Sequence, residues 1–430
     1  MNMILSVLKL LQMRSKIKTQ VFKFNLCRMC KSKNLHEVVK LSPTPPANAF
    51  LKKKELKKPE SFFPLRVNFC SKCGQLQLTH VVSPELLFRN YIYVSSTSPV
   101  FIAHFAEYAS SIIKKFKLNK DSLVIDIGSN DGILLTPIKK RGVKVLGVDP
   151  AREIAKKATK NGITTIPEFL TIKLANKIVK KYGYADVVTA NNAFAHIHNL
   201  DEIVESVKIL THNEGVFVIE FPYLVDFLEK NLFDTIYHEH VSYLSIRPLV
   251  ALFNRFGMEI FDLKKVNSHG GSLRIFVKRV GGKHIVQGIV KDYINNELKL
   301  GLNNIRTYKK FAKKIEDNKN KLISLLKKLK TQGRTIIGYG APAKGNTLLN
   351  YFKIGPEILD YIVDDSIYKQ GLYTPGTHIQ ILPFEKIEET KPDYIFILAW
   401  NFAQPLMNKL SDFKKSSGHF IIPVPEAGII

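Results

Sequence analysis

Asp126-Ile127-Gly128-Ser129-Asn130-Asp131-Gly132 closes an apolar run that begins at Leu123. A second apolar run, 143–148, ends at Asp149-Pro150, and residues 133–140 between the two runs can form a short helix. This pattern predicts a strand–turn–helix–strand unit with an acid at the tip of each strand. In that geometry a nucleoside cofactor lies across the carboxyl edge of a parallel sheet. The glycines let the backbone approach the ligand, and Asp149 can accept hydrogen bonds from both ribose hydroxyls.

The spacing of the glycines decides between cofactors. A dinucleotide-binding turn has the pattern G-x-G-x-x-G and aims a helix N-terminus at a pyrophosphate. Here only Gly128 and Gly132 are present, and Asp126 and Asp131 would repel a pyrophosphate. A cationic sulfonium cofactor with an amino-acid tail suits the turn better, and the D-x-G-x-x-x-G pattern resembles motif I of class I S-adenosylmethionine methyltransferases. The residues predicted to bind S-adenosylmethionine are Asp126, Gly128, Asn130, Gly132, Asp149, Pro150, Glu168, Phe169 and Asn191.

Length and composition describe a globular protein of two or three domains. The chain has 430 residues, of which 45% are hydrophobic and 10% aromatic. No apolar run approaches the length that spans a bilayer, and residues 1–20 lack the basic start and the small-residue cleavage site of a signal peptide. We therefore expect a cytoplasmic protein with no membrane partner.

The formal net charge of +27 raises the question of nucleic-acid binding. Lysine is spread along the chain and is densest at 308–330, a distribution that solvated helix faces explain. The charge is also compatible with attraction of an anionic small substrate. We expect no nucleic-acid partner, and a monomer or a weak homo-oligomer.

The cysteines form two pairs with the spacing of metal-binding knuckles. Cys27-x-x-Cys30 and Cys70-x-x-Cys73 contain all the cysteines of the chain. Four thiolates in two such pairs can surround a tetrahedral Zn²⁺ and leave no open position for chemistry. Disulfides are the alternative, but nothing in the sequence indicates secretion. We predict a structural zinc site.

Composition shifts and turn residues divide the chain into four segments. They are an N-terminal extension (1–23), a zinc-binding domain (24–90), a methyltransferase domain (91–285) and a C-terminal α/β domain with a leading helix (286–430). Alternating strand and helix patterns predict an α/β fold, with a doubly wound sheet in the third segment and a second α/β unit in the fourth. The strands expected in the doubly wound sheet are Leu123–Ile127, Val143–Val148, Ile163–Ile166, Ala185–Ala190, Gly215–Phe221, Met258–Lys264 and Ser272–Arg279, the last two forming an edge hairpin. The fourth segment should hold an amphipathic helix over 305–331 and strands at Thr335–Gly338, Tyr361–Asp364, Tyr394–Ala399 and Phe420–Pro423.

A glycine-rich turn with a lysine follows the first of these C-terminal strands. It reads Tyr339-Gly340-Ala341-Pro342-Ala343-Lys344-Gly345-Asn346. Backbone N–H groups and one cation facing an anion make this turn a candidate phosphate site. A turn with a purely structural role is the alternative.

Two histidines, a glutamate and a tyrosine stand together in Tyr237-His238-Glu239-His240, after the fifth strand and a short helix that begins near Tyr223. In a doubly wound sheet this segment lies over the carboxyl edge beside the cofactor. A histidine is suited to removing a proton from a carbon next to a carbonyl, because its pKa lies near operating pH. The neighbouring carboxylate can orient the ring or hold a substrate hydroxyl, and His196 should project into the same cleft. A second metal site is the alternative reading of these histidines.

The ordered set of motifs resembles the sugar C-methyltransferase family, which methylates C3 of nucleotide-linked 4-keto-6-deoxy sugars. The likeness runs from about Phe24 to near the C-terminus. Besides the cysteine knuckles and the glycine turns, the motifs are Pro46-Ala47-Asn48, Tyr91-Ile92-Tyr93-Val94-Ser95-Ser96, Asn192–His196, Glu220-Phe221-Pro222-Tyr223-Leu224, Tyr237–His240, His269-Gly270-Gly271-Ser272-Leu273-Arg274, Lys369-Gln370, Pro375-Gly376-Thr377-His378-Ile379 and Ala399-Trp400-Asn401. One departure is Val424-Pro425-Glu426-Ala427-Gly428, which lacks the histidine that some relatives carry after Val-Pro-Glu.

The resemblance implies a role for individual residues. It makes His240 the base, with Glu239, Tyr237, His196 and Tyr93 as polar partners around the sugar; His238 occupies a variable position of its motif. The residues implied to bind the nucleotide-linked sugar are Lys344, Tyr339, Asn346, Glu220 and His269. The resemblance also implies a three-part fold, in which the C-terminal domain (286–430) is Rossmann-like and helps hold this substrate.

Three other classes of function stay open. A nucleic-acid methyltransferase acting on amino groups would carry two prolines after the fourth strand, where Asn191-Asn192-Ala193-Phe194 has none, and one acting on pyrimidine C5 needs a cysteine outside the knuckles. A nicotinamide-dependent oxidoreductase is disfavoured by the incomplete glycine pattern. A non-catalytic scaffold is disfavoured by the histidine motif beside an intact cofactor motif.

Overall fold

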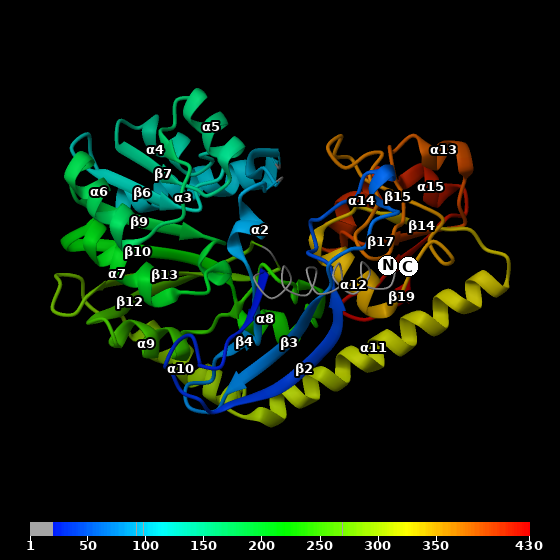
Figure 1. Cartoon of the computed structure of the whole chain (residues 1–430), viewed down its shortest axis with the longest axis horizontal. Helices are drawn as coiled ribbons and strands as arrows, with labels where there is room; N and C mark the ends of the chain where they lie inside the picture. Colours follow the sequence, from blue (N-terminus) through cyan, green and yellow to red (C-terminus); the bar gives the residue numbers. More distant parts are fainter. Residues whose placement is uncertain (1–19, 92, 98, 269) are drawn as a thin grey trace, which may run out of the picture.

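The structure, a computed structural model, describes residues 20–91, 93–97, 99–268 and 270–430. Figure 1 shows two α/β lobes side by side, the central one and the C-terminal one. The strands β2 (Leu35–Thr44) and β3 (Phe63–Cys70) lie below and between the lobes, and the long helix α11 (Ile305–Thr331) runs from there beneath the C-terminal lobe. Among the described residues, no helix is both long and apolar enough to cross a membrane.

The central lobe is a seven-stranded sheet in the order β12-β13-β10-β9-β6-β7-β8. Its strands are β6 (Leu123–Ile127), β7 (Lys144–Val148), β8 (Thr165–Ile166), β9 (Ala185–Asn191), β10 (Thr211–Pro222), β12 (Met258–Val266) and β13 (Ser272–Arg279). The first five are parallel, and β13 pairs antiparallel with both β10 and β12. The predicted doubly wound sheet with an antiparallel edge hairpin is therefore confirmed.

Helices cover both faces of this sheet, which explains why its inner strands are apolar without alternation. All five residues of β6 are buried. One face packs on the helices α3 (Pro99–Phe116) and α4 (Leu135–Lys139), where Tyr108 and Ile112 meet Val124 and Val218. The helices of the remaining central connections are α5 (Arg152–Lys160), α6 (Ile172–Tyr182), α7 (Leu200–Leu210), α8 (Leu224–Glu229) and α9 (Ile246–Asn254).

A four-stranded antiparallel sheet in the order β11-β4-β3-β2 forms the N-terminal unit. It contains β4 (Leu76–Leu78), and its edge strand β11 (Ser242–Tyr243) comes from far along the chain, directly after the Tyr237–His240 segment. The strands β1 (Val21–Lys23) and β5 (His80–Val82) pair beside it, and α2 (Pro84–Phe88) leads toward the central lobe. The segment that carries the histidine motif is thus part of two domains at once.

The C-terminal lobe is a six-stranded sheet in the order β16-β15-β14-β17-β18-β19. Its strands are β14 (Ile336–Tyr339), β15 (Ile362–Val363), β16 (Ile381–Leu382), β17 (Tyr394–Ile397), β18 (His419–Ile422) and β19 (Gly428–Ile429), all parallel except β19. Its helices are α12 (Ala343–Phe352), α13 (Lys386–Thr390), α14 (Ala403–Lys409) and α15 (Ser411–Lys415), and α10 (Gly288–Lys299) precedes α11.

Helix α11 has the bounds that the sequence predicted, and its apolar stripe ties the lobes together. Its buried residues recur every three or four positions and include Tyr308, Phe311, Ile315, Leu322 and Leu329. Phe311 packs on Phe227 of the central lobe, with ring centroids 5.0 Å apart, and Tyr308 packs on Phe69 of β3. A single helix therefore contacts all three parts of the fold.

Candidate active site

The turn after β6 has the backbone that its glycines require. Gly128 and Gly132 have φ values of 70° and 83°, in the region that side chains disfavour. A Cβ on Gly128 would lie 2.6 Å from the Cβ of Ala193, because the turn packs against the loop after β9. The backbone N–H of Gly128 returns to the carbonyl of Val148 at 2.8 Å, which joins the tips of β6 and β7.

Asp149 lies at the tip of β7 and is held by the turn. Its two carboxylate oxygens accept hydrogen bonds from the backbone N–H groups of Asn130 and Ala151, each at 2.8 Å. Burial raises the pKa of this carboxyl, and the two N–H groups oppose the rise. Each oxygen keeps a second lone pair, so the predicted bonds to ribose hydroxyls are chemically available. Pro150 follows directly at the end of the strand.

Asp126 makes a different set of contacts. Its Oδ1 accepts from Thr189 Oγ1 at 2.6 Å and from Asn191 Nδ2 at 3.2 Å, both on β9. Burial raises its pKa to about 7 against these two bonds. In the structure Asp126 and Asn191 therefore brace the strand tips, and their contact with the cofactor stays a prediction.

Buried acceptor atoms without a partner mark the same edge of the sheet. Within the described residues, Oγ of Ser129 and Oδ1 of Asp131 after β6, and Oδ1 of Asn191 and Asn192 after β9, have no hydrogen-bond partner. Unsatisfied buried acceptors are costly, and they fit a ligand that brings N–H and O–H donors. An ammonium, an adenine amino group and ribose hydroxyls are such donors, so the residues present fit S-adenosylmethionine.

Glu168 and Phe169 lie on the loop after β8 and meet a residue that we did not predict for the site. The guanidinium of Arg89 contacts Glu168 Oε2 at 3.1 Å and lies 4.7 Å from the ring centroid of Phe169. Arg89 ends α2, so this contact links the N-terminal unit to the predicted cofactor edge. Arg89 lies outside the motifs that we recognised, so nothing in the sequence signalled this contact.

The structure brings His240, Tyr237 and His196 together. The rings of His240 and His196 stack with centroids 5.0 Å apart, and the ring of Tyr237 lies 4.1 Å from that of His240. His240 Nδ1 lies 2.8 Å from the carbonyl oxygen of Thr235. A carbonyl can only accept, so Nδ1 carries the proton and Nε2 is the basic nitrogen of the neutral ring. Nδ1 of His240 is therefore held by the Thr235 carbonyl and not by the carboxylate of the neighbouring Glu239.

Glu239 is buried and has partners from two other segments. Its Oε1 accepts from Asn48 Nδ2 at 2.7 Å, and its Oε2 accepts from the Tyr91 hydroxyl at 3.0 Å. Burial raises its pKa to about 7, against the lowering effect of Asn48 and Tyr91. Asn48 and Tyr91 stand in motifs that carried the resemblance, but we did not predict a site role for either.

Tyr93 lies between the histidine cluster and the cofactor turn. Its ring is 6.4 Å from that of Tyr91, and its backbone carbonyl accepts from Asn130 Nδ2 at 3.0 Å. His238 points elsewhere: it is buried, with Nε2 3.3 Å from the carbonyl of Phe63 on β3. Its position agrees with leaving it out of the catalytic set.

Glu220, predicted to contact the substrate, is fully buried at the end of β10. Its Oε2 accepts from Arg274 Nε and Nη2 at 2.9 and 2.7 Å, and its Oε1 lies 2.7 Å from His104 Nε2. Burial would raise its pKa, but His104 and Arg274 hold it below the usual value. These contacts give Glu220 protein partners, and its contact with the substrate stays a prediction. His269, predicted for the same role, lies outside the described residues.

Lys344 is placed next to the turn that precedes the histidine motif. Its Nζ lies 3.8 Å from the ring centroid of Trp400 and contacts Asn401 Oδ1. Trp400 Nε1 donates to Asp234 Oδ2 at 2.6 Å. Burial lowers the pKa of Lys344 to about 8 and raises that of Asp234 to about 6, and each charge favours the other.

The other two residues of this turn with predicted substrate contacts are held by protein groups. The buried side chain of Asn346 donates to the Ala47 carbonyl at 2.7 Å. The hydroxyl of Tyr339 lies 3.2 Å from Asp365 and 3.1 Å from Lys409 Nζ. In the structure Asn346 fastens the C-terminal lobe to the N-terminal unit, and its contact with a ligand stays a prediction.

The four cysteines come together as predicted. All are free thiols, and their Sγ atoms lie within 4.8 Å of one another. The sulfurs of Cys27 and Cys73 are 3.5 Å apart, and those of Cys30 and Cys70 are 3.7 Å apart. Zinc–sulfur bonds of about 2.3 Å in a tetrahedron place sulfurs about 3.8 Å apart, so this closed set of thiols fits a structural zinc ion.

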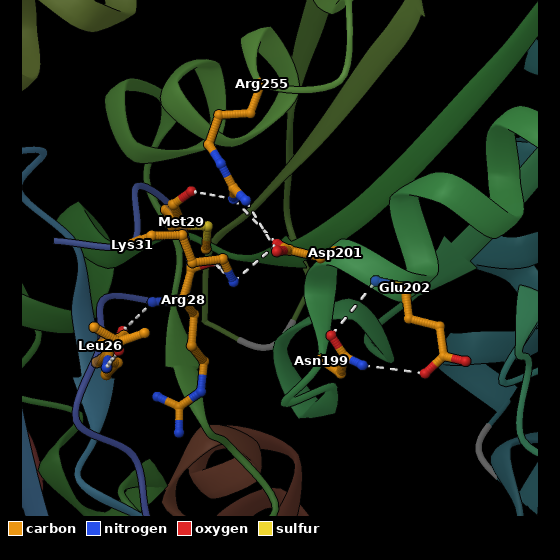
Figure 2. Close-up of polar contacts among 9 residues, drawn as sticks. Leu26, Arg28, Met29, Lys31, Asn199, Asp201, Glu202 and Arg255 are labelled. Atoms are coloured by element: carbon orange, nitrogen blue, oxygen red, sulfur yellow. Dashed lines mark hydrogen bonds and ion pairs between the residues drawn. The ribbon is translucent and has the colours of Figure 1, made fainter.

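The first metal-binding turn is held against α7 and α9 of the central lobe by ionic and backbone contacts. Figure 2 shows Asp201 of α7 accepting from Lys31 and from Arg255, while Arg255 also donates to the carbonyl of Met29. Beside them, Asn199 caps the N-terminus of α7. Its side chain accepts a hydrogen bond from the backbone N–H of Glu202 and donates one to the Glu202 carboxylate. The first cysteine turn therefore sits directly on the central lobe.

Three family models match successive parts of the chain. They are described as "Putative zinc binding domain" (residues 27–88), "Methyltransferase domain" (101–263) and "C-methyltransferase C-terminal domain" (267–425). The third match includes β13 of the central sheet. Our division at residues 23, 90 and 285 stays a prediction.

Relatives of known name and known structure extend these matches. The C-methyltransferase NovU of Streptomyces niveus is 35% identical over 404 residues, which cover 94% of this chain and 96% of NovU. A protein of Pyrococcus horikoshii is similar in structure, with 15% identity, 46% of this chain and 96% of that chain covered, and a TM-score of 0.36. An S-adenosylmethionine-dependent methyltransferase of Clostridium acetobutylicum has 14% identity, coverage of 41% and 91%, and a TM-score of 0.34.

Proposed function

We propose that this chain, which belongs to the family of S-adenosylmethionine-dependent C-methyltransferases, methylates C3 of a nucleotide-linked 4-keto-deoxy sugar. NovU is named as a C-methyltransferase, and the ordered motifs resemble those of enzymes that act on such sugars. Proton exchange and methyl transfer with a panel of such sugars test both the sugar class and the enolate mechanism.

The observation that carries the proposal is the setting of His240. The Thr235 carbonyl fixes the protonated nitrogen at 2.8 Å, so Nε2 is the atom that can take a proton. The ring of His196 stacks on the imidazole, and the tilted ring of Tyr237 also contacts it, so both restrict its orientation. This is an arrangement for moving one proton at a defined atom.

The mechanism follows from the acidity of a carbon beside a ketone. Nε2 of His240 removes the C3 proton, and the C–H electron pair becomes the enolate. A donor aimed at the C4 oxygen stabilises the developing charge, a role for which Tyr237 and His196 are the candidates. The bound cofactor supplies an electrophilic methyl group, so C3 exchanges its proton for a methyl group.

Glu239 acts beside this base. Because its pKa is raised to about 7, it can carry a proton near neutral pH and donate to, or accept from, a sugar hydroxyl. Asn48 and Tyr91 fix its orientation. We therefore assign Glu239 to the sugar and the Thr235 carbonyl to the orientation of His240.

The test separates proton removal from methyl transfer. The His240→Ala protein is incubated with a panel of nucleotide-linked 4-keto sugars in deuterated water, and loss of the C3 proton signal is followed by NMR. We expect exchange and transfer of labelled methyl to fall by about 10²–10⁴-fold, while calorimetric affinity for the cofactor is unchanged. Glu239→Gln should be milder, and His36→Ala, on an exposed histidine of β2, serves as the control.

Two results would count against the proposal. Exchange at the wild-type rate in His240→Ala would remove His240 from the role of base. Absence of methyl transfer by the wild-type protein to every sugar of the panel would reject the substrate class.

A further inference from the structure

Arg28 is a buried cation between two of the cysteines of the metal site. It stands directly after Cys27, and its relative exposure is 0%. Figure 2 shows its guanidinium pointing away from Asp201, which accepts from Lys31 and Arg255. Among the described residues, no carboxylate forms an ion pair with Arg28.

The guanidinium is bonded to the backbone beside the histidine motif. Its Nη1 donates to the carbonyls of Leu78 on β4 and Val241, at 2.9 and 3.1 Å. Val241 directly follows His240, and its carbonyl also accepts from the N–H of Leu78 at 3.0 Å. The remaining nitrogens, Nε and Nη2, have no hydrogen-bond partner in the described part of the chain, and the ring of Phe24 lies 4.6 Å from the guanidinium carbon.

A charge in this position needs compensation. Burying an ion without a counter-charge is strongly unfavourable, and two carbonyl dipoles replace only part of its hydration. Zinc bound by Cys27, Cys30, Cys70 and Cys73 would provide it, because one Zn²⁺ and four thiolates carry a formal net charge of −2. Arg28 directly follows the ligand Cys27, so the first knuckle itself carries the buried cation.

We propose that Arg28 is a positioning residue that couples the zinc site to the catalytic turn. The zinc–thiolate charge compensates the guanidinium, and the guanidinium fixes the backbone at Val241, next to the base. Loss of the metal leaves a buried cation uncompensated, so the first knuckle rearranges and the Val241 carbonyl loses its partner. The proposal rests on the proposed function only in that His240 is taken as the base.

The experiment compares two substitutions in the full-length zinc protein. Arg28→Met keeps the volume and removes the charge, whereas Arg28→Lys keeps the charge and N–H donors. Arg66→Met is the matched control, because Arg66 is a half-exposed arginine of β3 in the same sheet, paired with Glu37. For each protein we measure the rate of zinc release to a colorimetric chelator, kcat and KM for methyl transfer, and cofactor affinity by calorimetry.

We expect Arg28→Met to release zinc roughly tenfold faster and to lose roughly tenfold in kcat, with KM and cofactor affinity unchanged. Arg28→Lys should restore both values to within a few-fold of wild type, and Arg66→Met should match wild type. A merely structural role would not separate kcat from KM in this way. Wild-type zinc release together with wild-type kcat in Arg28→Met would overturn the proposal.

Hydrogen–deuterium exchange of the wild-type protein tests the coupling without any variant. Removal of zinc by chelation should lower the protection of residues 235–243, while residues 123–127 of the central sheet keep theirs. Unchanged protection of 235–243 after complete zinc removal would overturn the proposal even if Arg28→Met failed to fold. Zinc release and hydrogen exchange do not depend on the substrate, so their outcome is distinguishable from a failure of the proposed function.

Discussion

Four buried acids of the central lobe show how surroundings set the role of one residue type. Asp149 is bonded to backbone N–H groups, Asp126 to side chains of the next strand, and Glu239 to Asn48 and Tyr91. Glu220 has full ionic partners in Arg274 and His104. The partners of Asp149, Asp126 and Glu239 are neutral, so burial raises the pKa of these three carboxyls. For Glu220 the effect of burial is outweighed by His104 and Arg274, which lower its pKa. We therefore expect Asp126 and Glu239 to exchange protons near neutral pH and Glu220 to remain charged.

Asp149 is the residue at which cofactor affinity can be tested most directly. Asp149→Ala should weaken S-adenosylmethionine binding by about tenfold to a hundredfold, because a charge-assisted pair of hydrogen bonds contributes roughly 1.5–3 kcal/mol. Isothermal titration calorimetry measures the change. Asp121→Ala, at an exposed acid just before β6, is the control for a general effect of charge. Equal affinity in Asp149→Ala and wild type would place the ribose elsewhere.

At the scale of elements, local sequence pattern accounts for the sheet and for the long helix. Each strand predicted for the two α/β sheets overlaps an observed strand, with bounds that differ by at most four positions, and α11 has the predicted bounds. The two-residue strands β16 and β19 of the C-terminal sheet were not predicted. The two-residue strand β11 was not predicted, because its existence depends on pairing with β4, which is remote in sequence. Short strands carry too few residues for a period to be read.

In the site, too, the sequence predicted what depends on neighbouring residues and missed what depends on contacts between distant segments. Residue types and their order indicated His240, Tyr237 and His196 as one cluster, and the structure places their rings together. The partners of Glu239 and Glu220 were missed, since Asn48 and His104 lie on other elements and reach them only through the tertiary fold. Side-chain pairing across elements leaves no trace in a local pattern.

The zinc site belongs to the N-terminal unit with the sheet β11-β4-β3-β2, and we expect the stability of this sheet to depend on the metal. One zinc ion per chain is expected by elemental analysis, and Cys70→Ser should reduce it to near zero. Structural zinc contributes about 10–16 kcal/mol in small domains, as much as the whole stability of a typical domain, so this sheet should lose its fold without the metal. Circular dichroism and limited proteolysis would show the loss.

Ser71→Ala is the matched control for the cysteine substitution, because Ser71 is exposed in the same knuckle and does not belong to the thiol cluster. It should keep one zinc per chain and the wild-type proteolysis pattern. Zinc retained in full by Cys70→Ser, or none found in wild-type protein purified without chelator, would contradict a four-cysteine site.

At the scale of the whole molecule, the segment Pro46-Ala47-Asn48 joins three units. Asn48 donates to Glu239 of the central lobe, and the carbonyl of Ala47 accepts from Asn346 of the C-terminal lobe. The segment itself follows β2 of the N-terminal sheet. The two lobes are joined again where Asp234, just before the histidine motif, meets Trp400. A substrate with its sugar at His240 and its phosphates at Lys344 would use both junctions.

Lys344 makes that two-lobe arrangement testable through pH. Its pKa is lowered to about 8 by burial, with Asp234 opposing the decrease. Below pH 8 the ammonium is present and can pair with an anionic diphosphate; above it the proton is lost and the attraction with it. KM for a nucleotide-linked sugar should therefore rise above about pH 8, approaching tenfold per pH unit if only the protonated form binds. Steady-state kinetics from pH 6.5 to about 9.5 measure this dependence.

Substitution of Lys344 decides whether that rise comes from this side chain. Lys344→Ala should raise KM at pH 7 by about tenfold to a hundredfold and remove the alkaline rise, because the titrating group is gone. Lys344→Arg keeps its charge throughout this range, so KM should stay near the wild-type value at pH 7 and remain flat above pH 8. Lys327→Ala, at an exposed lysine of α11, controls for the net charge of the protein. A wild-type KM in Lys344→Ala would mean that the phosphates bind away from the glycine turn and that the C-terminal lobe holds the substrate by other residues.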